Sequence, residues 1–484
     1  MPPSFDSLQP QRIWYWFGEL CRVPRASGDE SAASELVVDF ARELGLRWKR
    51  DESGNVMIYK PGAGLASDSL PIAVQAHLDM VAEKAAGSSH DFASDPIAPE
   101  VEGDWVTAKE TTLGADNGIG VALMMALLED DDAQHPPLEC LFTVDEERGL
   151  TGASHLDPSW ISARRLINLD SESEGRFCIG CAGGLDILVE MPLSFVQPAG
   201  DLSPYALTVG GLKGGHSGME IGRSRANAIR VMARAVSRLV DSCGVSVVSL
   251  AGGTKRNAIP RIASALLMMP SSREAQCVSI VSAVEQERRA EFAGIEPAME
   301  IRLRPFDARP TRVLTPESAR RALDLVLALP HGVEKMSGVE PTLVETSDNL
   351  ATLGFEGDGM VAALTLRSLL EEAKYGLAER ILAIARLAGC RAITGGSYPG
   401  WRPDPLSPLL RTAALVWKEF SGHDASVETV HAGVECGIIG AAVGGMDMIS
   451  MGPDIRDVHV PGEKVSVSST ARFWTFFRTL LARL

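Results

Sequence analysis

Short apolar segments alternate with amphipathic segments along the first third of this chain, and this alternation limits the possible folds more than any other feature. Apolar runs at 71–76, 138–144 and 165–169 each have the length of one buried strand. Residues 31–44 and 117–128 repeat apolar side chains every three or four positions, as amphipathic helices do. Buried strands separated by helices predict an α/β sheet that is covered on both faces.

A change of character between residues 185 and 394 indicates a second domain. Strand-like and helical segments continue there, but clustered carboxylates and histidines return only after Gly395. At 484 residues, the chain also exceeds the length at which one hydrophobic core usually stops growing. We therefore expect a domain split between residues 1–184 and 395–484, with an α+β domain inserted at 185–394.

Charge and hydropathy exclude several classes of partner. The formal net charge is -17 and no long run of Lys or Arg occurs, so nucleic acid and anionic membranes would be poor partners. The N-terminal segment lacks the basic start and apolar core of a signal peptide. The apolar stretches 118–128 and 437–445 are too short or too rich in glycine to span a bilayer. These features predict a cytoplasmic protein.

Five short segments place Asp, Glu or His beside predicted strand ends and helix starts. The first contains His77 and Asp79, which are two residues apart and so point to the same side of a strand. A carboxylate at this spacing can fix the tautomer of a metal-bound imidazole. An isolated pair of this kind is more often a surface contact.

In the second segment, Asp116 opens the predicted helix at 117–128. Its alternative role is an ordinary helix N-cap, which Asp often fills. Gly114, Gly118 and Gly120 around it indicate a crowded turn, where another group approaches the backbone closely.

The other three segments add carboxylates and a second histidine. Glu146 and Glu147 follow one apolar strand, Asp170 ends the next, and His459 lies in a turn-rich loop. Acids at the carboxyl ends of strands would converge on the crevice where open α/β sheets bind ligands. Each segment alone is more often structural, but five in one chain favour a site.

This set of residues predicts a pair of divalent metal ions. Two histidines and three carboxylates, with one carboxylate shared, would give each ion three protein ligands. Mixed imidazole and carboxylate ligation suits zinc, cobalt or manganese. Two such ions can activate water and stabilise the oxyanion of amide hydrolysis.

These motifs, in this order, resemble the co-catalytic metallopeptidases of family M20, and within it the bacterial aminoacyl-histidine dipeptidases. The similarity extends from about residue 10 to the C-terminus. Further matching segments lie at 23–28, 79–84, 89–92, 210–218, 253–260 and 431–437. The resemblance implies a Zn-peptidase-like mixed sheet with an inserted α+β lid and dimerisation domain, and hence a homodimer.

The resemblance also implies roles for the metal ligands. Asp116 would bridge two ions, most simply zinc. His77 and Asp170 would complete one ion site, and Glu147 and His459 would complete the other.

Two catalytic residues are implied beside these ligands. Asp79 would orient His77, and Glu146 would act as general base on the water between the ions, delivering its proton to the leaving amine. The implied reaction is the removal of one residue from dipeptides, preferentially those ending in histidine.

In the inserted domain, the resemblance implies substrate contacts at four positions. His216 would stabilise the oxyanion, and Asn257 and Arg367 would hold the terminal carboxylate of the peptide, with a backbone contact from Gly433. The ordinary alternatives are a turn histidine, a capping Asn and a surface Arg.

Other functions stay open at this stage. An acyl-amino-acid deacylase, a tripeptidase or a carboxypeptidase would use the same metal chemistry. A catalytically silent relative that acts as a binding protein is a further alternative, although the complete set of predicted ligands argues against it.

Overall fold

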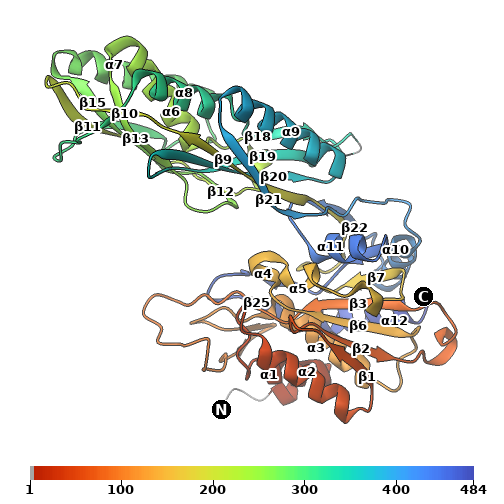
Figure 1. Ribbon diagram of the computed structural model, residues 1–484. Coiled ribbons are helices and arrows are strands. Elements are labelled where there is room, and N and C mark those ends of the chain that lie inside the picture. The colour runs from red at the N-terminus through yellow and green to blue at the C-terminus, as the bar shows by residue number, and fades with distance from the viewer. Residues whose placement is uncertain (1–4, 339) are drawn as a thin grey trace. The chain divides into compact units, whose positions relative to one another are not determined.

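The computed structural model describes residues 5–338 and 340–484 (Figure 1). Contacts divide the chain into two compact units: Met1–Cys181, Trp401–Thr429 and Val434–Leu484 form the first, and Ala182–Gly400 and Val430–Gly433 form the second. Residues 1–4, at the start of the N-terminal segment that lacks the features of a signal peptide, lie outside the described residues. The sequence analysis predicts the domain boundaries after residues 184 and 394. The assignment of the inserted part as a lid and dimerisation domain stays a prediction.

The first unit is built on an eight-stranded mixed sheet, as the sequence predicts. The four central strands, β6, β3, β7 and β23, run parallel, whereas β1, β2 and β8 pair antiparallel with their neighbours. Every residue of β3 and β6 is buried, as expected for strands covered on both faces. In spatial order, the strands are β1 (Arg47–Arg50), β2 (Val56–Lys60), β6 (Leu138–Thr143), β3 (Ile72–His77), β7 (Arg165–Asn168), β23 (Asp447–Ser450), β8 (Arg176–Cys181) and β22 (Ser426–Val430).

Helices pack around this sheet, and α3 (Ala115–Glu129) differs from its prediction. The sequence predicts an amphipathic helix, but every residue from Asn117 to Leu128 is buried. The reason is a second layer: α3 contacts β3 and also α1, so it has no solvent-facing side. The remaining helices of this unit are α1 (Gln11–Leu20), α2 (Ser31–Glu43), α4 (Glu146–Gly149), α5 (Thr151–Ser154), α10 (Pro408–Ser421), α11 (Glu435–Ala442) and α12 (Val467–Leu481).

A small antiparallel sheet in the first unit holds the loop that carries His459. This loop connects β24 to β25, and β25 also pairs with β5. The loop is thereby fixed at both ends, although its own residues are irregular. The strands are β24 (Ile455–Arg456), β25 (Lys464–Ser466), β5 (Trp105–Thr107) and β4 (Glu100–Glu102).

The second unit has an α+β architecture. Its nine-stranded sheet has only antiparallel pairings among the described residues, and α6, α7, α8 and α9 cover one face (Figure 1). The helices are α6 (Ala228–Cys243), α7 (Glu274–Glu291), α8 (Pro316–Ala328) and α9 (Glu371–Leu387). The strands are β16 (Glu300–Pro305), β11 (Leu202–Gly210), β15 (Ala263–Pro270), β13 (Ser246–Gly252), β19 (Val344–Glu356), β20 (Gly359–Ser368), β9 (Gly183–Pro192), β21 (Arg391–Tyr398) and β18 (Gly332–Met336).

The core of the second unit follows from helical periodicity. In α6, Ile229, Met232, Val236 and Leu239 are spaced by three or four residues and are all buried. They belong to one apolar cluster with the inward side chains of the sheet. Across the described residues of both units, no helix combines the length and apolarity that a bilayer span needs.

Candidate metal centre

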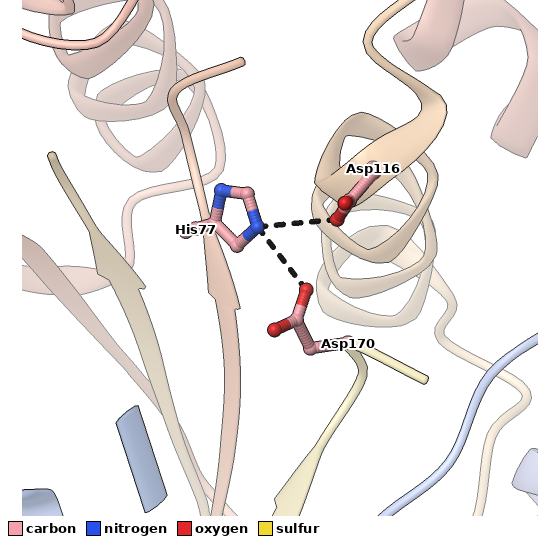
Figure 2. Close-up of side chains that lie close together, drawn as sticks. All are labelled: His77, Asp116 and Asp170. Carbon is pink, nitrogen blue, oxygen red and sulfur yellow. Dashed lines mark hydrogen bonds and ion pairs between the residues drawn. The ribbon is translucent and has the colours of Figure 1, made fainter. Parts of the chain in front are cut away.

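His77 ends β3 and faces two carboxylates from neighbouring elements (Figure 2). Its Nε2 atom lies 3.3 Å from Oδ1 of Asp116 and 3.1 Å from Oδ1 of Asp170. Asp116 lies in the first turn of α3, and Asp170 follows β7, which runs parallel to β3 beside it. The parallel pairing therefore brings the two strand ends together, as the crevice argument predicts.

The second oxygen of Asp116 faces another histidine. Oδ2 of Asp116 lies 3.2 Å from Nε2 of His459, and that nitrogen is 2.9 Å from Oε1 of Glu147. Three groups of possible ligands result, each with ligand atoms within 4.8 Å of one another: His77, Asp116 and Asp170; Asp116, Glu147 and His459; and His77, Glu146 and Glu147. Asp116 is shared by the first two groups.

The structure bears on the alternative role of Asp116 as an ordinary N-cap. Its backbone angles are extended (φ -79°, ψ 108°), as those of an N-cap residue would be. Among the described residues, however, its carboxylate contacts His77 and His459, and no helix amide donates to it. The turn thus leaves the side chain available for a ligand.

Asp79 contacts His77 and the segment that carries Glu146 and Glu147. Its Oδ1 atom lies 3.3 Å from Nδ1 of His77, and its carboxylate accepts the backbone N–H groups of Glu146 and Glu147 at 3.0 and 3.1 Å. Ser27 donates a further hydrogen bond to it. Burial raises the pKa of Asp79, but these contacts outweigh it and lower the pKa to about 2. A permanently ionised Asp79 would hold the His77 ring in one orientation.

Glu146 lies among the same groups. Its carboxylate oxygen, a ring nitrogen of His77 and an oxygen of Glu147 fall within 4.8 Å of one another. Burial raises the pKa of Glu146 well above its usual range, opposed by His77 and assisted by Asp170 and Glu147. A raised pKa makes this carboxylate a stronger base, which suits a group that accepts a proton.

The charges of this cluster fit divalent cations. Asp79, Asp116, Glu146, Glu147 and Asp170 surround only two imidazoles. Contacts with Asp116 and Glu147 raise the pKa of His459 to about 11. Burial raises the pKa of Asp170 to about 6. Such a set of nitrogen and oxygen atoms is the donor chemistry that zinc, cobalt or manganese takes.

A buried polar layer lies along the same strands and was not assigned a role from sequence. Oε2 of Glu435, at the start of α11, accepts hydrogen bonds from Gln75 Nε2 at 2.6 Å and Thr143 Oγ1 at 2.7 Å. Gln75 accepts one from Asn168 in turn. This network ties β3, β6 and β7 together close to their carboxyl ends. Gln75 and Asn168 are polar residues inside otherwise apolar strands, which is the signal that could have identified the layer.

The four predicted substrate contacts all lie in the second unit, near one another. Ser217, the residue after His216, donates its backbone N–H to the carbonyl of Asn257. A side chain at Gly218 would meet both the His216 ring and the aliphatic chain of Arg367. Arg367 donates to the Tyr398 hydroxyl at 2.9 Å.

Gly433 completes this group. A side chain there would meet the Tyr398 ring at 2.8 Å, so Tyr398 connects Gly433 to Arg367. Arg367 is 6% exposed, which contradicts its alternative as a surface residue. The neighbouring His431 is also buried, and its Nε2 atom contacts Ser347 Oγ at 2.7 Å.

Comparisons with known proteins agree with this geometry. Residues 207–296 match the peptidase dimerisation domain M20_dimer. Over 481 residues the chain is 35% identical to the cytosol non-specific dipeptidase of Escherichia coli K12, and the match covers 99% of each protein. The crystal structure of aminoacylhistidine dipeptidase from Vibrio alginolyticus matches with a TM-score of 0.89 and 34% identity, covering 99% of this chain and 98% of that one. Aminopeptidase PepT from Bacillus cereus ATCC 10987 matches with a TM-score of 0.57 and 16% identity over 98% of each chain, which shows a shared fold alone.

Proposed function

Since this chain belongs to the M20 family of metallopeptidases, as its motifs indicate, we propose that it hydrolyses dipeptides and prefers those with a C-terminal histidine. The dipeptide substrate is supported by the 35% identity to a dipeptidase along nearly the whole chain. The preference for histidine is supported by the similarity to an aminoacylhistidine dipeptidase.

One observation carries the proposal: the two oxygens of Asp116 face different histidines. This arrangement supports a bridging role for Asp116, with His77 and Asp170 on one ion and Glu147 and His459 on the other. Bound there, two zinc ions would lower the pKa of water and polarise the peptide carbonyl. Cobalt or manganese could replace zinc.

Protein groups would move the proton in this reaction. Glu146 would accept a proton from the attacking water and donate it to the amine that leaves. Its position beside His77 and Glu147 supports this role, and leaving Glu146 off the ions keeps it available as a base. Asp79 would keep His77 oriented through its contact with Nδ1.

The second unit would recognise the substrate. Arg367 offers a guanidinium group suited to the terminal carboxylate of a dipeptide, with Asn257 and the backbone of Gly433 beside it. His216 would stabilise the oxyanion. The proximity of these residues within the second unit supports a shared role.

The test combines metal replacement with a substrate panel. Metal-free protein would be supplied with zinc, manganese or cobalt and assayed with β-alanyl-His, Gly-His, Leu-Gly, a tripeptide and an N-acetyl amino acid. We expect dipeptide cleavage that depends on metal and is fastest for Xaa-His. Cleavage of the acylated substrate alone would favour the deacylase alternative, and cleavage of the tripeptide alone would favour a tripeptidase.

Glu146→Gln, with Asp145→Asn as its matched control, tests the role of the base. Asp145 is the adjacent carboxylate, pairs with Arg148, and has φ of 53°, a conformation that Asn tolerates. We expect Glu146→Gln to lower kcat by about 10²–10⁴-fold while both ions still bind, and Asp145→Asn to change it little. No activity in wild-type protein with two bound ions would instead support the silent-relative alternative.

Assembly and location are part of the same proposal. The match of residues 207–296 to a peptidase dimerisation domain supports a homodimer formed through the second unit. The similarity to a cytosol non-specific dipeptidase supports a cytoplasmic location. Sedimentation of the purified protein, with a dimer as the expected result, tests the first of these.

A further inference from the structure

Glu463 holds the turn that presents Asp116. This side chain is 2% exposed. Its Oε2 atom accepts the backbone N–H groups of Leu113 and Gly114, both at 2.9 Å, and its Oε1 atom accepts that of Asp116 at 3.1 Å. All hydrogen bonds found for this carboxylate among the described residues therefore come from one turn.

Arg25 holds the same turn through its carbonyl group. Arg25 is also 2% exposed, and its Nη2 atom donates to the carbonyl of Gly114 at 2.5 Å. Its Nη1 atom donates to the carbonyls of Leu78 and Asp79, at 3.2 and 3.4 Å. One guanidinium group thus joins the Asp116 turn to the chain that follows His77.

Together the two side chains connect three of the five ligand-bearing segments, those of Asp116, His77 and His459. Glu463 follows His459 by four residues, and its backbone carbonyl accepts a hydrogen bond from Thr107, which fixes its end of the loop. The loop of His459 is therefore joined to the Asp116 turn by Glu463, and that turn is joined to His77 by Arg25. Asp116 lies between them, with one oxygen directed to each histidine.

We propose that Glu463 and Arg25 are positioning residues that orient the Asp116 carboxylate so that it can bind two ions at once. This inference rests on the proposed function in one respect, the binding of divalent ions by Asp116. It assigns the two residues no contact with substrate or metal. Their effect is transmitted through the backbone of Leu113, Gly114 and Asp116.

The substitution Glu463→Gln would disturb this turn in a specific way. One carboxylate oxygen would become an NH₂ group, which can only donate, yet both oxygens now accept from backbone N–H groups. Whichever way the amide is turned, a donor faces a donor. The orientation that keeps Leu113 and Gly114 satisfied places the conflict at Asp116 itself.

A matched control is available at Glu139, in the same unit. This side chain is 6% exposed, and its Oε2 atom accepts the backbone N–H groups of Ser162 and Ala163 at 2.9 and 3.0 Å, while its Oε1 atom accepts from the Ser162 hydroxyl. Glu139 lies near the opposite end of β6, about 13 Å from Thr143 at about 3.3 Å per residue. Glu139→Gln therefore removes a buried carboxylate away from the ligands without forcing a donor conflict, because the amide oxygen can replace Oε2 and the NH₂ group can donate to the Ser162 hydroxyl.

The experiment measures ion affinity independently of catalysis. Metal-free wild type, Glu463→Gln, Glu139→Gln and Arg25→Lys would be titrated with zinc in competition with a chromophoric chelator, and their urea unfolding would be recorded without metal. We expect Glu463→Gln to weaken zinc binding by about 10–100-fold and Glu139→Gln by less than about 3-fold, and the urea titrations measure the stability that each variant loses. Arg25→Lys should also weaken binding, because one ammonium group cannot reproduce the fork that reaches both segments.

The outcomes separate this inference from the proposed function. Unchanged zinc affinity in both Glu463→Gln and Arg25→Lys would overturn the inference while the proposed function stands. Equal weakening in Glu139→Gln would also overturn it, because the loss of a buried carboxylate elsewhere in this unit would then explain the effect. If wild type bound no zinc, cobalt or manganese, the proposed function itself would fail, and the inference with it. If Glu463→Gln fails to fold, the zinc affinity of Arg25→Lys is compared with that of Glu139→Gln, and equal affinities would overturn the inference.

Discussion

Replacing Gly114 with alanine is expected to destabilise the first unit by about 2–5 kcal/mol. Gly114 has φ of 69°, and a left-handed conformation costs a residue with a side chain about 1–2 kcal/mol. An added Cβ atom would also lie 2.3 Å from Nη2 of Arg25 and 2.7 Å from Sδ of Met80. Overpacking of this kind costs about 1–3 kcal/mol. Arg25 cannot move away cheaply, because it is buried and hydrogen-bonded to Leu78 and Gly114.

Gly103→Ala separates the two contributions. Gly103 has φ of 62°, similar to that of Gly114, but an added Cβ atom would meet nothing within 4 Å. This variant should therefore lose only the cost of the left-handed conformation, about 1–2 kcal/mol. The difference between the two variants measures the close approach of Arg25 and Met80.

Tryptophan fluorescence during urea unfolding of the metal-free protein is a suitable assay. All eight tryptophans belong to the first unit, so the signal reports its unfolding alone: Trp14, Trp16, Trp48, Trp105, Trp160, Trp401, Trp417 and Trp474. Equal losses of stability in Gly114→Ala and Gly103→Ala would refute the reasoning. It would mean that the turn around Asp116 is not crowded.

Three further results are expected. Zinc at about 100 times its dissociation constant should stabilise the wild-type protein against unfolding by about 2.7 kcal/mol per site. Asp116→Asn should lose most of this stabilisation, and an equal stabilisation of the variant would contradict the bridging role. Arg367→Lys should lower kcat/KM for dipeptides by about 10–100-fold, mainly through KM, because a charged hydrogen bond is lost; a change in kcat alone would contradict carboxylate binding. Burial raises the pKa of Glu435 to about 8, so the folded metal-free protein keeps a proton that the unfolded chain releases above pH 4.5. Stability should therefore fall as pH rises from 4.5 to 8, by at most about 1.4 kcal/mol per pH unit, and Glu435→Gln should flatten this slope in urea titrations.

Local patterns in the sequence were sufficient for the succession of elements. The strand expected at 138–144 is β6 (Leu138–Thr143), and the helix expected at 31–44 is α2 (Ser31–Glu43). Periodicity works here because each element must bury its own apolar face, and the spacing of that face is set within the element. The same reasoning was wrong about the exposure of α3, because the second layer over α3 comes from α1, which its own periodicity does not reveal.

The sequence by itself determined the chemical types at the centre and, through its motifs, the family. Imidazole and carboxylate groups after predicted strands indicated a metal site before any distance was available. Only the tertiary structure decided that the Asp116 carboxylate leaves the helix amides unbonded and that its two oxygens face different histidines. It also decided the partners of Glu463, whose bond to the Asp116 amide spans 347 residues of sequence. The donors in that turn are backbone N–H groups, which every residue except proline carries, so only folding reveals which of them a distant carboxylate meets.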